Sequence, residues 1–104
     1  MKLSELRGKT VVVDMDGILC DESKTFERIF TNPIQKNIDI VNRLYYIGAT
    51  IIIHTARGWG ELKITLQQLR DWNVLYHTVI CGKPIADIVI DDRAINSFEG
   101  FEDV

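Results

Sequence analysis

The stretch Thr10-Val11-Val12-Val13-Asp14-Met15-Asp16-Gly17-Ile18-Leu19 decides the fold and the chemistry expected of this chain. Its β-branched run predicts a buried parallel strand, because strands covered on both faces are continuously apolar rather than alternating. The run ends in two carboxylates one residue apart, and an ionised carboxylate away from water must be paired or bound to a cation. Gly17 then allows a sharp turn that brings the backbone close to a ligand. The stretch therefore predicts a strand end that holds a metal ion and a phosphate.

Length and composition are those of one ordinary globular domain. The chain has 104 residues, 46% of them hydrophobic and 26% charged, and we interpret residues 1–104 as a single domain. The net charge of −3 gives no support for nucleic-acid binding through a basic surface. No segment approaches the ~20 apolar residues that span a bilayer. We therefore expect neither a nucleic-acid partner nor a membrane.

The N-terminus and the cysteines predict a cytoplasmic protein. Residues 1–7 carry charges where an export signal needs its apolar core. Cys20 and Cys81 lack the spacing of metal ligands. We expect both to be reduced side chains that fill space in the packing.

Strands and helices alternate along the rest of the chain. Thr31-Asn32-Pro33 is expected to cap and open a helix, and Gly48 to end it in the left-handed conformation. Alternation of this kind implies a parallel sheet in an α/β sandwich, with the carboxyl ends of the strands at one edge, where ligands bind. The expected elements are strands at 10–14, 49–54, 75–80 and 86–90, helices at about 33–48 and 59–72, and an irregular flap at 17–32.

Polar residues stand at the ends of these predicted strands. Four acids, one hydroxyl and one ammonium group fit a hard cation beside a phosphate, because Mg²⁺ prefers carboxylates, waters and phosphate oxygens. Without a cation the carboxylates would repel one another and some would take up protons. The residues concerned are Asp14, Asp16, Thr55, Lys83, Asp91 and Asp92.

Four motifs, in this order, resemble those of the haloacid dehalogenase (HAD) superfamily of phosphohydrolases. They are Val12–Gly17, Ile52–Thr55, Lys83 and Val89–Asp92, and the match spans residues 11–92. The resemblance implies a three-layer sandwich with a small parallel sheet and a Rossmann-like core. It also implies a capless member, since no insertion of tens of residues follows the first or second strand.

The resemblance implies a two-step phosphoryl transfer. Asp14 would attack phosphorus and form an aspartyl-phosphate. Asp16 would protonate the leaving oxygen and later deprotonate water, which requires a pKa above that of Asp14. Thr55 would bind the transferring phosphoryl group and Lys83 would offset its charge.

The resemblance also implies a Mg²⁺ site and a substrate site. The metal ligands would be the Asp14 carboxylate, the Asp16 carbonyl and Asp91, with Asp92 acting through water. Gly17 would approach the substrate. Arg57 would either contact substrate phosphate or sugar, or form a surface ion pair.

Among capless members the chain is similar to small phosphatase-like proteins of capsule or lipopolysaccharide sugar synthesis. Thr55-Ala56-Arg57, Gly82-Lys83-Pro84 and Asp91-Asp92-Arg93-Ala94 carry that similarity. The expected substrate is a small phosphate monoester such as a sugar phosphate, and a second copy of the chain is a candidate cover for the open site. Ile18 departs from the family, which often has threonine there.

Two other functions are compatible with the same residues. A phosphoacceptor module resembling response-regulator receivers would also pair acids with a threonine and a lysine, although there the acids do not recur after the lysine. A degenerate scaffold would keep Mg²⁺ without turnover. Taken singly, the acids also suit strand-end turns or helix caps.

Overall fold

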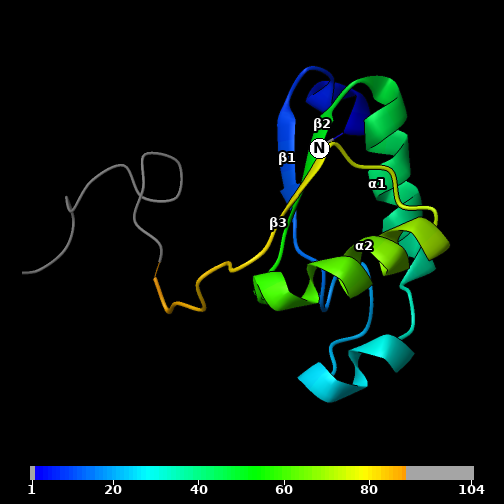
Figure 1. Cartoon of the computed structure of the whole chain (residues 1–104). Helices are drawn as coiled ribbons and strands as arrows, with labels where there is room; N and C mark the ends of the chain where they lie inside the picture. The colour runs from blue at the N-terminus through cyan, green and yellow to red at the C-terminus, as the bar shows by residue number, and fades with distance from the viewer. Residues whose placement is uncertain (1, 89–104) are drawn as a thin grey trace, which may run out of the picture.

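Three short runs rich in β-branched residues form a parallel sheet (Figure 1). The computed structural model describes residues 2–88. Its strands are β1 (Thr10–Val13), β2 (Thr50–His54) and β3 (Thr78–Ile80), in the order β1-β2-β3. Val13 lies opposite Ile53, and Ile53 lies opposite Val79. The predicted α/β class with a parallel sheet is confirmed.

Two helices connect these strands and lie on the same side of the sheet (Figure 1). They are α1 (Gln35–Ile47) and α2 (Leu62–Asp71), and three short 3-10 helices accompany them, η1 (Leu3–Leu6), η2 (Thr25–Phe30) and η3 (Trp59–Glu61). No helix within residues 2–88 combines the length and apolar character that crossing a bilayer requires. The core that forms between helices and sheet contains Val13, Met15, Leu19, Ile38, Val41, Leu44, Ile51, Ile53 and Leu69.

Only one face of the sheet is covered by helices within residues 2–88. Side chains alternate between the faces of a strand, and on β2 Ile51 and Ile53 are fully buried while Ile52 is not. On β1 the side chain of Val12 is 58% exposed. The expectation of strands buried on both faces in three layers is therefore not met in this part of the chain, which forms two layers.

Helix α1 begins at Gln35, two residues later than predicted. Its N-cap is Ile34, without a side-chain cap, so the prediction that Thr31 or Asn32 caps it is wrong. Both residues instead close the neck of the preceding loop. The Thr31 hydroxyl donates to the Asp21 carbonyl at 2.5 Å, and the Asn32 carbonyl accepts the Asp21 N–H at 2.9 Å. At the other end Gly48 has φ +104°, as predicted for a left-handed C-cap.

Strand β3 is shorter than predicted, because a side chain of α1 binds the backbone of Leu75, the first residue of the predicted strand. The Asn42 side chain accepts the Leu75 N–H and donates to the Asn73 carbonyl, both at 2.8 Å. Residues 75–77 consequently run beside α1 before the strand begins at Thr78. The second helix also starts later than predicted, since its first three residues form η3.

The predicted fourth strand is absent from the residues that are described. Residues 86–88 are irregular, and Ile88 is 59% exposed. The remainder of that prediction, Val89 and Ile90, lies outside residues 2–88. The described sheet therefore ends at β1 on one side and at β3 on the other.

His77 completes the pairing of β2 with the segment before β3, which sequence reasoning did not anticipate. The Nδ1 of its ring accepts the Ile51 N–H at 2.9 Å, and its backbone N–H donates to the Ile51 carbonyl at 2.9 Å. The ring also stacks on Tyr45, with 4.7 Å between the ring centroids. The ring therefore satisfies a backbone donor of a fully buried residue.

His77→Ala is expected to lower the free energy of unfolding by about 1–2 kcal/mol, because the Ile51 N–H loses its acceptor. Urea denaturation measures this change. Thr78→Ala, at an exposed neighbouring position, is the matched control and should change stability by less than about 0.5 kcal/mol. A His77→Ala protein as stable as the control would refute the role assigned to the ring.

Candidate functional site

The turn after β1 carries two carboxylates on the same side of the chain. Because side chains alternate in extended backbone, Asp14 and Asp16 are partly exposed while Met15 between them is fully buried. The Met15 carbonyl accepts the Leu19 N–H at 2.9 Å, which closes the turn. Gly17, at φ +88°, supplies the left-handed residue that the turn requires.

Backbone hydrogen bonds continue beyond the sheet and join the segments that follow β2 and β3. The Thr55 N–H donates to the Ile80 carbonyl at 2.9 Å, and the Lys83 N–H donates to the Thr55 carbonyl at 2.9 Å. The Gly82 N–H donates to the Arg57 carbonyl at 2.8 Å. These bonds fix Lys83 at the same sheet edge as the carboxylates after β1.

A pocket of about 360 Å³ lies at this edge. It brings together Asp14, Asp16 and Lys83, three of the residues that the sequence predicted for the site. Three carboxylates and two cations line it, so charges of both signs face one small volume. The complete lining is Asp14, Asp16, Glu22, Arg28, Ala56, Lys83, Pro84, Ile85 and Ala86.

Arg57 is fully buried and binds the carboxylate of Asp16 through two hydrogen bonds. Its Nε donates to one oxygen of the Asp16 carboxylate at 3.0 Å and its Nη2 to the other at 2.9 Å. Its Nη1 donates to the Thr65 hydroxyl at 3.1 Å and to the Gln68 side-chain oxygen at 2.6 Å. Its ion pair is buried rather than on the surface. Arg57 is not among the residues that line the pocket, and its predicted contact with a substrate stays a prediction.

The pair with Arg57 sets the protonation of Asp16. Burial alone would raise the pKa of Asp16, but the hydrogen bonds and charge of Arg57 outweigh it, with help from Arg28, and the pKa lies below its usual value. The same hydrogen bonds raise the pKa of Arg57 against the effect of its burial. A general acid at neutral pH needs the opposite shift. In this arrangement Asp16 is an ionised, doubly hydrogen-bonded carboxylate.

Helix α2 supplies the acceptors that make a buried arginine tolerable. Thr65 and Gln68 are buried together with Leu69 on its inner side. A charge without partners would be too costly to bury. Two polar residues three apart on a helix that follows Thr55-Ala56-Arg57 were the signal available in the sequence.

Thr55 and Gly17 do not line the pocket. Thr55 is fully buried, and its hydroxyl oxygen accepts the Arg57 N–H at 3.1 Å, so it shapes the turn after β2. Gly17 is exposed in the turn after β1. Their predicted contacts with a phosphoryl group stay predictions.

The described carboxylates meet part of what a magnesium site needs. The Asp14 carboxylate accepts the Met15 N–H at 2.8 Å, and within residues 2–88 no basic side chain forms an ion pair with it. No group of three acidic, histidine or cysteine side chains suited to a metal occurs in that range. Asp91 and Asp92, the other predicted ligands, lie outside it. Asp14 fits Mg²⁺, which binds through one or two carboxylates, waters and phosphate oxygens.

The two cysteines are buried and free, as predicted. Burial raises the pKa of Cys20 to about 11, and the neighbouring Asp16 carboxylate adds to the effect. Burial likewise raises the pKa of Cys81. Both side chains are therefore protonated thiols at neutral pH and unsuited to nucleophilic chemistry.

Comparison with known proteins supports the fold. A crystal structure of an MCSG target from Vibrio cholerae is similar to this chain, with 27% sequence identity over 84% of this chain and 82% of that one, and a TM-score of 0.69. No family model and no curated protein matches the chain. The solved neighbour carries no functional name, so function must be argued from the site.

Proposed function

We propose that this protein is a Mg²⁺-dependent phosphohydrolase of the HAD type, without a cap, which acts on a small phosphate monoester such as a sugar phosphate through an aspartyl-phosphate. The observation that carries the proposal is the pocket at the carboxyl edge of the sheet, where the Asp14 carboxylate and Lys83 line one volume. A nucleophile needs a free lone pair, and Asp14 accepts a single backbone N–H in the described structure.

The residues of the pocket divide the work in this proposal. Asp14 attacks phosphorus, and Lys83 offsets the charge of the transferring phosphoryl group. Asp14 and the Asp16 carbonyl would hold Mg²⁺ together with Asp91, with Asp92 acting through water; Asp91 and Asp92 lie outside residues 2–88. The cation, when bound, keeps Asp14 ionised and shields its approach to an anionic phosphate.

Asp16 limits both steps. While it is ionised it cannot protonate the oxygen that leaves when Asp14 attacks phosphorus. As long as Arg57 holds both of its carboxylate oxygens, Asp16 is a weak base for the water that must hydrolyse the aspartyl-phosphate. Turnover then requires substrate or metal to loosen the Asp16–Arg57 pair. This observation favours one alternative, a phosphoacceptor module in which Asp14 carries a long-lived phosphoryl group.

Turnover of phosphate monoesters is expected to depend on Mg²⁺. A panel of sugar phosphates and simple monoesters, followed by phosphate release, should show activity with Mg²⁺ that falls to the background with chelator and returns when Mg²⁺ is restored. Release of no phosphate from any ester, or release that chelator leaves unchanged, would contradict the proposal.

The lifetime of a phosphorylated protein separates the two functions. A phosphoryl donor such as acetyl phosphate is added with Mg²⁺, the donor is removed, and the label on Asp14 is followed by mass spectrometry. Loss of label as fast as turnover fits a phosphatase. Label that persists for hours, with little phosphate release, fits a phosphoacceptor. Metal binding by calorimetry with neither label nor turnover would indicate a degenerate scaffold.

A further inference from the structure

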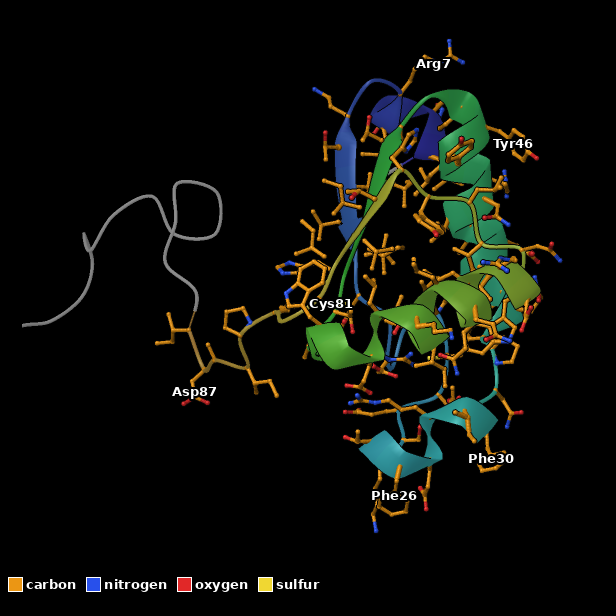
Figure 2. All side chains as sticks on the ribbon, viewed as in Figure 1. Arg7, Phe26, Phe30, Tyr46, Cys81 and Asp87 are labelled. Carbon is orange, nitrogen blue, oxygen red and sulfur yellow. The ribbon has the colours of Figure 1, made fainter. Side chains whose placement is uncertain are left out.

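The loop after β1 brings a second cation into the pocket. Arg28 lies on η2 (Thr25–Phe30) and lines the pocket together with Asp14 and Lys83. Its neighbours Phe26 and Phe30 point away from the body of the protein (Figure 2) and are 75% and 77% exposed. The loop thus turns its aromatic side chains outward and its arginine toward the site.

The position of Arg28 is fixed from several sides. Hydrogen bonds between Asp21 and Asn32, and from the Ile34 N–H to the Leu19 carbonyl at 2.8 Å, close the neck of the loop. The loop is therefore tied to the body at its base.

Helix α2 and the residue before it hold Arg28 itself. The Gln68 side chain donates to the Arg28 carbonyl at 2.5 Å, and the Arg28 guanidinium forms an ion pair with Glu61. Gln68 also accepts a hydrogen bond from Arg57, so Arg28 belongs to the same network as Asp16. A cation held in this way can recognise a ligand without first losing much conformational freedom.

The guanidinium keeps donors that the described structure does not use. Its Nη1 reaches Glu61, whereas its buried Nε has no acceptor within residues 2–88. A buried N–H without an acceptor is costly. Its Nη2 also donates no hydrogen bond within residues 2–88, and the planar fork of an arginine that lines the pocket matches carboxylate and phosphate oxygens.

The charges of the pocket leave Arg28 available for an anion other than the transferring phosphate. Lys83 is the cation fixed at the sheet edge beside the proposed nucleophile, and the charge of Asp16 is already offset by Arg57. Glu61, the partner of Arg28, does not line the pocket. Glu61 offsets part of the charge of Arg28, and Glu22 is a further carboxylate in the lining. The Arg28 guanidinium remains a hydrogen-bond donor for an anionic group of a substrate in the pocket.

We propose that Arg28 is a specificity-determining residue, and that it selects substrates in which a second anionic group, a carboxylate or a second phosphate, accompanies the phosphate to be transferred. This inference rests on the proposed phosphatase function. It adds a substrate class to that function: phosphorylated acids and bisphosphates are preferred to neutral phosphate monoesters of the same size.

The test compares matched substrates in wild-type protein and Arg28→Met. The carboxylate arm pairs phosphoglycolate with 2-hydroxyethyl phosphate, and the phosphate arm pairs fructose 1,6-bisphosphate with fructose 1-phosphate. The ratio of kcat/KM for anionic over neutral substrate is expected to fall about 10- to 100-fold in Arg28→Met in at least one arm. The arm that responds identifies the second group, and Arg28→Lys should recover part of the ratio.

Arg43→Met, an exposed arginine on α1, is the control and should leave both ratios unchanged. Ratios that Arg28→Met leaves unchanged in both arms would overturn the inference, even if kcat/KM falls equally on both members of each pair. If wild-type protein turns over no ester, the proposed function fails, and calorimetry with phosphoglycolate and Mg²⁺ decides the inference. Binding about 10-fold weaker in Arg28→Met would support it, and equal or undetectable binding in both proteins would overturn it.

Discussion

Arg57→Met is expected to lower the free energy of unfolding by about 3 kcal/mol, a large part of the 5–15 kcal/mol typical of a domain. The substitution removes the cation that holds both oxygens of Asp16 and leaves Thr65 and Gln68 without their donor. Breaking a buried pair at one partner usually costs about 3–5 kcal/mol. We expect the lower end, because the side chain of Asp16 is 15% exposed and can be hydrated. Urea denaturation at neutral pH measures the loss.

Two variants show whether the ion pair causes this loss. Arg43→Met removes an exposed arginine and should change stability by less than about 0.5 kcal/mol. Asp16→Asn added to Arg57→Met removes the charge left unpaired and should restore part of the stability, so that the two substitutions are not additive. Additive losses, or an Arg57→Met protein as stable as wild type, would refute the structural role of the pair.

The pH dependence of stability follows from the lowered pKa of Asp16. A carboxyl group whose pKa is lower in the folded than in the unfolded protein stabilises the fold at pH values above about 4. That contribution is lost as pH falls through the folded-state pKa. The stability advantage of wild type over Asp16→Asn should therefore be constant near neutral pH and shrink below pH ~4.

The residues that could be predicted from the sequence are those at the carboxyl ends of parallel strands, which meet at one edge of the sheet. Asp14 ends a predicted strand, Asp16 and Lys83 each follow one, and the carboxyl ends of parallel strands share an edge. These residues consequently line one pocket. Their placement depended on the order of strands and helices, which hydrophobic periodicity reveals.

The residues that sequence reasoning missed depend on side-chain contacts between elements. Arg28 lies in a loop without periodicity, and its approach to the pocket depends on a neck closed by backbone bonds. Gln68 looks like part of the exposed side of a helix until Arg57 is known to be buried beneath it. Nothing in local patterning distinguishes a buried arginine from a surface one, because the acceptors that stabilise it come from another element.

The Asp16–Arg57 pair connects the stability of this protein with its chemistry. It anchors the turn that carries Asp14, since Asp16 follows that residue by two positions and is fixed to α2 through Arg57. Asp14, the proposed nucleophile, gains from this rigidity. The ion pair with Arg57 lowers the proton affinity of Asp16. Both halves of the proposed reaction therefore require a rearrangement around Asp16, because an ionised Asp16 held by Arg57 can neither protonate the leaving oxygen nor readily accept a proton from water.

Asp14→Asn is expected to lower phosphate release by at least about 10³-fold, because an amide cannot attack phosphorus and only binding and electrostatic contributions remain. The side-chain oxygen of asparagine can still accept the Met15 N–H, which Asp14 accepts at 2.8 Å. Stability should therefore remain within about 0.5 kcal/mol of wild type. Phosphate release from the preferred ester, with urea denaturation of the same samples, measures both quantities.

Asp21→Asn is the matched control, because Asp21 is exposed and the hydrogen bonds described above use its backbone N–H and carbonyl. It should retain wild-type turnover. The phosphoryl label acquired from acetyl phosphate gives a second readout, since Asp14→Asn should abolish it whether the wild-type label is short-lived or persistent. Turnover that survives in Asp14→Asn would remove this carboxylate from the reaction. Loss of label without loss of turnover would separate phosphoryl acceptance from hydrolysis, and the hydrolytic mechanism would then require a nucleophile other than Asp14.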